Sequence, residues 1–216
     1  MTLSVARMRP QMTVTSLLLL AIAGCSGSST TTAKIASPPA STSVRPSGGL
    51  SPVQRPVPAE KNPPGDIPDN LAFVAYRNGA GRYAFTHPEG WAETTRGSSV
   101  GFTDKLNGVQ LSVGALSTPP TPASAGDQDV PKLKSTQAAF ELRTISAAKL
   151  AAGTGVRIVY RRNSAPDPVT GRQYRDEVER YEIVSGGREV IVELYGPVGA
   201  DNVDAYRTMI QSLRLG

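Results

Sequence analysis

Two long alternating segments that flank a pair of glycines constrain the fold of this chain most strongly. Residues 175–185 and 188–195 alternate apolar and polar side chains with the period of two that is typical of β-strands. Gly186 and Gly187 separate these segments, and a glycine pair favours a two-residue hairpin because both turn positions need a positive φ. A third alternating segment, 155–161, lies upstream. The sequence therefore predicts an antiparallel sheet.

The same periodicities predict the other elements of the domain. Further strands are expected at 71–76, 83–87, 99–103, 109–115 and 140–150, with a hairpin turn at Asn107-Gly108. A short helix is expected at 130–140, with Pro131 in its first turn. A terminal helix is expected after an Asp201 cap, with Val203, Tyr206, Ile210 and Leu213 on one face. Long strands covered by such helices predict an α+β layer fold.

The N-terminus carries a short apolar run behind basic residues. Arg7 and Arg9 precede residues 17–23, which are all leucine, alanine or isoleucine. This order is typical of an export signal, and the run is shorter than the roughly 20 apolar residues that a transmembrane helix needs. Ala23 and Gly24 then supply small residues next to Cys25, the only cysteine.

This run resembles the signal peptide and lipobox of bacterial lipoproteins. The resemblance implies that residues 1–24 are removed and that Cys25 becomes a lipidated N-terminus, with a diacylglycerol thioether and acyl chains such as palmitate. Two or more acyl chains suffice for stable membrane attachment. The predicted location is the extracytoplasmic side of the cell membrane. The alternative is an ordinary secretory signal followed by a chance cysteine.

Composition divides the rest of the chain into a tether and a domain. Residues 25–69 are rich in serine, threonine and proline and have few large apolar side chains, so we expect a disordered tether. Residues 70–216 are expected to form one globular domain without a disulfide. Removal of residues 1–24 takes away Arg7 and Arg9 and no acidic residue, so the formal charge falls from +5 to +3. Because this small excess is not clustered, a nucleic-acid partner is not expected.

Three short motifs suggest enzymes but lack the required context. Residues 79–84 fit the dinucleotide pattern G-x-G-x-x-A, but a strand rather than a helix follows them. Residues 97–101 fit the nucleophile-elbow pattern G-x-S-x-G, but the only histidine, His87, lies upstream. Residues 146–149 fit S-x-x-K without the companion motifs of penicillin-binding proteins. The sequence therefore predicts no catalytic residues.

The sequence also predicts neither a metal site nor a cofactor. One histidine and a lipidated cysteine exclude the ordinary zinc ligand sets. The acidic groups Asp127/Asp129 and Asp176/Glu177/Glu179 lack the spacing of a calcium-binding loop, so we expect them on a solvated face. His87 is expected either as a hydrogen-bonded structural residue or at the rim of a pocket.

Residues 83–91, with the sequence YAFTHPEGW, resemble the opening motif of PsbP-like domains, and the helix that ends at 212–215 resembles the C-terminal pattern of that family. Together with the tether and the NSAPD segment at 163–167, they resemble actinobacterial PsbP-like or LpqN-type lipoproteins. The resemblance covers about residues 71–216. It implies an α-β-α sandwich around a central antiparallel sheet, and it implies no common catalytic site.

The loop after residue 163 is the predicted partner-binding surface, because binding residues concentrate on loops. Asn163, Asp167 and Arg172 are its candidate residues, and a plain hairpin loop is the alternative. The resulting hypothesis is a non-enzymatic, lipid-anchored protein that binds or scaffolds an envelope protein. The alternative is a subunit of an envelope transporter that binds a small ligand or assists transport.

Overall fold

The structure, a computed structural model, describes residues 53–61 and 65–216. Its elements are β1 (Phe73–Asn78), β2 (Tyr83–Pro88), β3 (Ala92–Arg96), β4 (Ser99–Asp104), β5 (Asn107–Val113), α1 (Pro122–Thr136), β6 (Glu141–Leu150), β7 (Gly153–Asn163), β8 (Arg175–Ser185), β9 (Arg188–Pro197), α2 (Val203–Ser212) and β10 (Arg214–Leu215). The predicted signal peptide, Cys25 and most of the predicted tether lie outside the described residues. Within the described ranges, neither helix is long and apolar enough to span a membrane.

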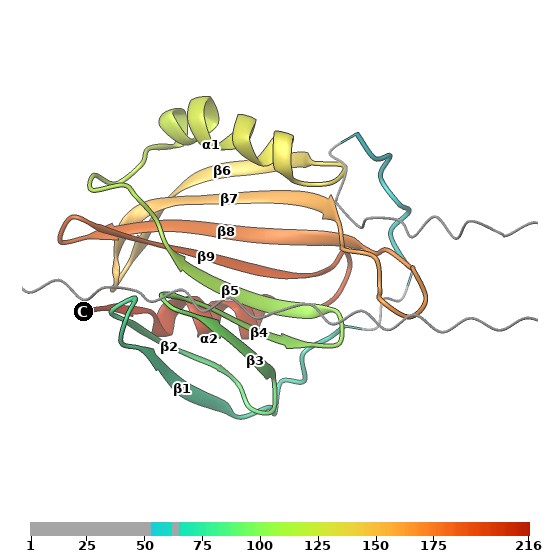
Figure 1. Ribbon diagram of the computed structural model, residues 1–216, viewed down its shortest axis with the longest axis horizontal. Coiled ribbons are helices and arrows are strands. Elements are labelled where there is room, and N and C mark those ends of the chain that lie inside the picture. The colour runs from blue at the N-terminus through green and yellow to red at the C-terminus, as the bar shows by residue number, and fades with distance from the viewer. Residues whose placement is uncertain (1–52, 62–64) are drawn as a thin grey trace, which may run out of the picture. The chain divides into compact units, whose positions relative to one another are not determined.

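The strands form two antiparallel sheets (Figure 1). The larger has the order β3-β4-β5-β9-β8-β7-β6, and the smaller has the order β1-β2-β10. The α+β class and the antiparallel sheet are therefore confirmed. The smaller sheet was not expected as a separate unit. It consists of the β1–β2 pair, to which Arg214 and Leu215 from the far end of the domain sequence add by pairing with Ala84 and Tyr83.

The β8–β9 hairpin has the predicted turn. Gly186 and Gly187 have φ values of 57° and 72°, which residues with a side chain rarely adopt, and Ser185 pairs with Arg188. The register of this hairpin divides the larger sheet into two faces. Face A carries the odd-numbered side chains of β8, such as Tyr181. Face B carries the even-numbered side chains, which include Val178, Arg180 and Glu182.

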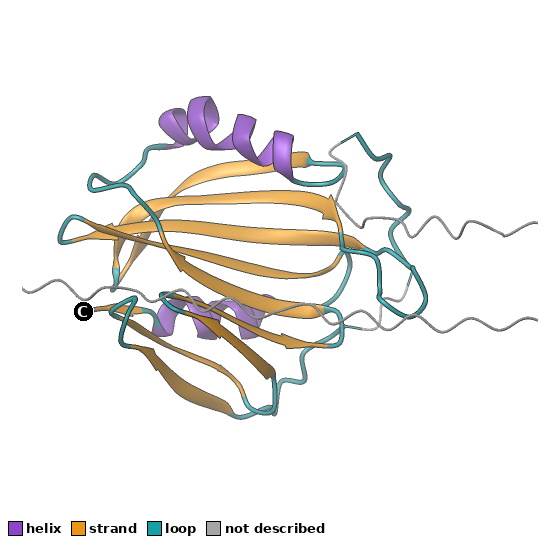
Figure 2. Ribbon diagram, viewed as in Figure 1, coloured by secondary structure: helices purple, strands orange, loops and turns teal. Residues whose placement is uncertain are grey.

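Face A packs against α2 and the smaller sheet, and this layer holds the main core (Figure 2). The core includes Phe85, Phe102, Tyr181, Ile183, Val192, Leu194, Met209, Ile210 and Leu213, all nine of which are at most 9% exposed. Two expectations for α2 are wrong. Val203 is 59% exposed, and the N-cap is Asn202 rather than Asp201. Asn202 does not cap with its side chain, because that side chain instead binds the main-chain N–H of Ile67 and the side chain of Asn107.

Face B is covered by α1 over β6, β7 and β8. The helix buries Ala125 and Leu133 against Val156, Ile158, Tyr160 and Val178. It begins at Pro122, earlier than predicted, because Thr121 and Ser124 form a reciprocal capping box. Pro131 therefore lies in the helix interior, contrary to the prediction. Its position is exposed, so water can solvate the carbonyl group that loses its partner.

Two further boundaries differ from the sequence prediction. Asn107 and Gly108 belong to β5, and the hairpin turn is Lys105-Leu106, with Lys105 at φ 52°. Asn107 is 3% exposed because its amide donates to the carbonyl oxygen of Gly65. Ile67 is 5% exposed within the core. The folded unit therefore starts upstream of residue 70.

Candidate functional site

The structure separates the three residues predicted for the loop after β7. Asn163 is 1% exposed at the end of β7, whereas Asp167 and Arg172 lie on the exposed part of the loop. Asn163 is therefore not available to an external partner. The sequence gives no sign of this burial, because asparagine at a strand end is also typical of an exposed turn.

Asn163 instead binds the N-terminal segment of the same chain. Its side-chain oxygen accepts from the main-chain N–H of Val57 at 3.0 Å, and its amide donates to the carbonyl oxygen of Arg55 at 2.8 Å. Arg175 donates to the same side-chain oxygen and to the carbonyl oxygen of Ala139. The buried amide of Asn163 thus helps to hold the segment 53–61 against the domain.

The exposed part of the loop is also internally bonded. The Asp167 carboxylate accepts from the main-chain N–H groups of Val169 and Thr170, and these bonds lower the pKa of Asp167. Arg172 forms an ion pair with Glu60 of the N-terminal segment and lies over the ring of Tyr174. These contacts shape the loop but leave few of its polar groups free for a partner.

The single histidine has a structural position. His87 is 8% exposed, its ring stacks on Phe102 with centroids 3.6 Å apart, and Nδ1 lies 2.9 Å from the carbonyl oxygen of Pro88. Burial lowers the pKa of His87. Ser99 of the G-x-S-x-G motif follows a hairpin turn rather than the strand-to-helix turn that a nucleophile elbow needs.

The acidic residues of β8 lie on two different faces. Glu177 and Glu179 point to face A, where they pair with Arg161 and Arg157. Asp176 points to face B and is 3% exposed, so the expectation of a solvated position is wrong for this residue. Across residues 53–61 and 65–216, no group of three or more potential metal ligands is found.

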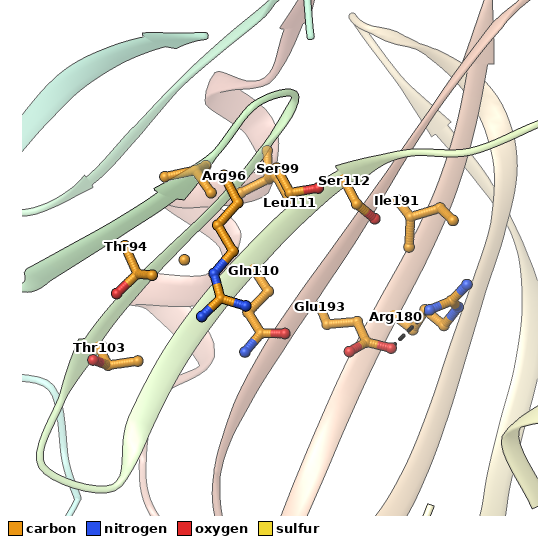
Figure 3. A pocket seen from close by; sticks show the side chains of 12 residues that line it. Thr94, Arg96, Ser99, Thr103, Gln110, Leu111, Ser112, Arg180, Ile191 and Glu193 are labelled. Carbon is orange, nitrogen blue, oxygen red and sulfur yellow. Dashed lines mark hydrogen bonds and ion pairs between the residues drawn. The ribbon is translucent and has the colours of Figure 1, made fainter. Parts of the chain in front are cut away.

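The candidate site is the half of face B that α1 leaves uncovered. A hollow of about 470 Å³ lies over β3, β4, β5 and β9 there. Its lining includes Thr94, Arg96, Thr103, Gln110 and Ser112, and Figure 3 shows the Arg96 side chain extending over it. Hydroxyl groups and apolar side chains such as Ile191 line it together, and the small side chains leave this part of the sheet surface open.

A buried charge cluster forms one wall of this hollow. Arg180 donates to Glu182 and to Glu193, each at 2.7 Å, and Tyr160 donates to Glu193 at 3.2 Å. Burial raises the pKa of Glu182, and Arg180 only partly opposes this effect. Glu182 Oε2 has no hydrogen-bond partner among the described residues. Arg180 is thus neutralised by its own neighbours.

A second hollow of about 430 Å³ continues the first toward the β7–β8 loop, and Thr103 and Gln110 line both. Arg162, Asp176 and Tyr195 form its inner wall. The guanidinium group of Arg162 lies 5.0 Å from the centre of the Tyr195 ring and 3.7 Å from the Asp176 carboxylate. Burial raises the pKa of Asp176 to about 7, although Arg162 and Arg175 act in the opposite direction.

The two hollows together form a groove that follows the strands, here called the face B groove. It runs from Ser112 and Arg96 at one end to Asp176 at the other. On β9, Ser112 pairs with Ile191 and Asp176 pairs with Pro197. The two ends of the groove are therefore about six residues apart along the strand. At about 3.4 Å per residue, the groove is roughly 20 Å long.

The sequence predictions did not identify this groove. The available signal is in β8, a long strand in which Asp176, Arg180 and Glu182 share one face with the apolar Val178. Charged side chains on the inner face of a central strand are unusual unless a polar site adjoins them.

No protein-family model and no curated protein matches this chain. Solved structures similar to it include cyanobacterial PsbP (CyanoP) from Synechocystis, with 15% sequence identity and a TM-score of 0.49 over 70% of this chain and 98% of that one. The Ran-binding protein Mog1p of Saccharomyces cerevisiae has 6% identity and a TM-score of 0.44 over 68% of this chain and 96% of that one.

A protein from Bacteroides thetaiotaomicron has 15% identity and a TM-score of 0.41, over 66% of this chain and 48% of its own. A PsbP protein is therefore among the structures similar to this chain. None of these three TM-scores reaches 0.5, so the similarities assign neither a family nor a function to it.

Proposed function

We propose that this protein is an exported lipoprotein, anchored through Cys25 on the extracytoplasmic side of the cell membrane, that binds an envelope protein with its face B groove. The observation that carries the binding part is that α1 covers only part of face B and leaves an open groove of mixed polar and apolar surface beside it. The signal-like run before Cys25 supports the anchor.

Binding without catalysis agrees best with the chemistry of the groove. Arg180, Glu182 and Glu193 are engaged with one another, and the only histidine is packed on the opposite face. The alternative, a carrier of an apolar ligand for a transporter, needs a cavity between sheet and helix. Phe102, Leu194 and Met209 fill that space on the α2 side.

The finer architecture is part of the proposal. We infer an α-β-α sandwich of the PsbP-like type, supported by one helix packing against each face of the larger sheet. The Pro-rich residues before position 53 would serve as the spacer between the lipid and the domain.

The anchor is tested by fractionation of cells that express Cys25→Ala, with Ser26→Ala as the matched control. The Cys25→Ala variant should leave the membrane fraction or fail to mature, while Ser26→Ala stays membrane-bound. Full membrane retention of a folded Cys25→Ala protein from which residues 1–24 have been removed would contradict the lipid anchor.

The binding face is tested by site-specific photo-crosslinking in intact cells. A photoreactive amino acid at Thr103, in the groove, should crosslink to one defined envelope protein, whereas the same probe at Thr208, on the exposed side of α2, should not. The Arg96→Glu substitution should weaken the Thr103 crosslink, and Arg77→Glu on β1 should not. Equal crosslinking from both probe positions would refute the assignment.

A further inference from the structure

Asp176 lacks the hydrogen bonds that a buried carboxylate normally has. Its side chain is 4% exposed and lines the groove, yet no hydrogen bond to it is found among the described residues. Its nearest charged neighbour, Arg162, lies at 3.7 Å, which is too long for a hydrogen bond. Because this carboxylate lines the groove and accepts no hydrogen bond from the described residues, it can accept one from a bound molecule.

Arg96 at the other end lacks an acidic partner. It is exposed, and it forms no ion pair within residues 53–61 and 65–216. Glu193, a carboxylate that lines the groove, is already paired with Arg180. An acidic group of a ligand would therefore meet an uncompensated cation at Arg96.

The floor between these ends suits an extended chain. Gly101 has no side chain to fill the groove, and a Cβ there would meet nothing closer than 3.6 Å, whereas the ring of Tyr195 covers Gly108. The groove is roughly 20 Å long, which equals about six residues of extended polypeptide. A compact small molecule could not reach Asp176 and Arg96 together.

We propose that the face B groove binds an extended peptide segment of the partner, with a main-chain N–H donating to Asp176 and an acidic side chain pairing with Arg96. This inference rests on the proposed function, since it specifies how the partner is held. A cationic side chain is disfavoured at Asp176 because Arg162 lies beside it. A main-chain amide supplies a neutral donor there, together with a carbonyl acceptor for Arg162.

The test selects random dodecapeptides displayed on phage against the full-length protein in detergent micelles. The enriched peptides should share an aspartate or glutamate, and synthetic copies should bind the protein in fluorescence anisotropy. Arg96→Glu should weaken this binding by about tenfold at low salt, and Asp176→Asn by about tenfold at any salt. Arg77→Glu is the charge control and should bind like the wild type.

Enriched peptides that bind both groove variants as tightly as the wild type would overturn the inference, and so would a selection without enrichment. Circular dichroism of each variant checks that the fold is intact. If the Thr103 probe still crosslinks to an envelope protein while no peptide is enriched, the partner-binding function stands and only the peptide mode fails. If peptides bind as expected but no crosslink forms in cells, the peptide mode stands and the envelope partner fails.

Discussion

Replacing Asp176 with asparagine should make the protein more stable at neutral and alkaline pH. Burial raises the pKa of Asp176 from 3.8 to about 7 in the folded state, while Arg162 and Arg175 on β7 and β8 oppose this effect and Tyr195 on β9 stays neutral. Between these two pH values the folded protein holds a proton that the unfolded chain has released. Stability therefore falls as the pH rises from 4 to 7, and the loss is complete above pH 7.

The size of this stability difference follows from the pKa values of Asp176 in the unfolded and folded states. One pKa unit corresponds to about 1.4 kcal/mol, so the ionised carboxylate costs the folded state about 4 kcal/mol at most. Asparagine has the shape of the protonated acid and carries no charge. Asp176→Asn should thus equal the wild type in stability below pH 4 and exceed it by up to about 4 kcal/mol at pH 9.

Urea unfolding followed by the fluorescence of Trp91, the only tryptophan, measures this difference across the pH range. Asp167→Asn is the matched control. Hydrogen bonds from Thr170 and Val169 lower the pKa of Asp167, so the effect of this substitution on stability at neutral pH has the opposite sign. A stability difference for Asp176→Asn that does not change with pH would refute the reasoning. So would a less stable Asp176→Asn protein at pH 9.

Two further predictions concern packing. Asn163→Ala should destabilise the protein by about 3 kcal/mol, since it removes several buried hydrogen bonds. It should also accelerate hydrogen exchange in residues 53–61, and unchanged exchange there would contradict the docking of this segment. Gly155→Ala should cost at least about 3 kcal/mol in thermal or urea unfolding, because its Cβ would lie 1.7 Å from the carbonyl oxygen of Glu182. Gly79→Ala, with nothing within 4 Å, should stay within about 0.5 kcal/mol of the wild type, and equal effects of the two glycine variants would refute the packing argument.

Elements with strong local signals were predictable from the sequence. The β8–β9 hairpin follows from two alternating strands and the Gly186-Gly187 turn, and no distant residue is needed to explain it. The α1 start was missed because its capping box uses Ser124 in place of the usual glutamate or glutamine. Pro131 then suggested a helix start, although an exposed helix interior tolerates it at a cost of about 3 kcal/mol.

Features that depend on distant contacts were not predictable. Asn163, Asn107 and Asn202 are buried because each binds main-chain or side-chain groups far away in the sequence. The groove depends on how much of face B one helix covers, which is a property of packing rather than of any single segment. The acidic residues of β8 alternate between two faces, and the alternation alone does not tell which face is buried.

Hydrogen-exchange mass spectrometry of the protein, with and without the partner that crosslinking identifies, shows whether that partner occupies the face B groove. Binding in the groove should slow exchange in β3, β4 and β5, which span residues 92–113, and leave exchange in α2 unchanged. Protection confined to α2 or to the smaller sheet, with no change in 92–113, would contradict it.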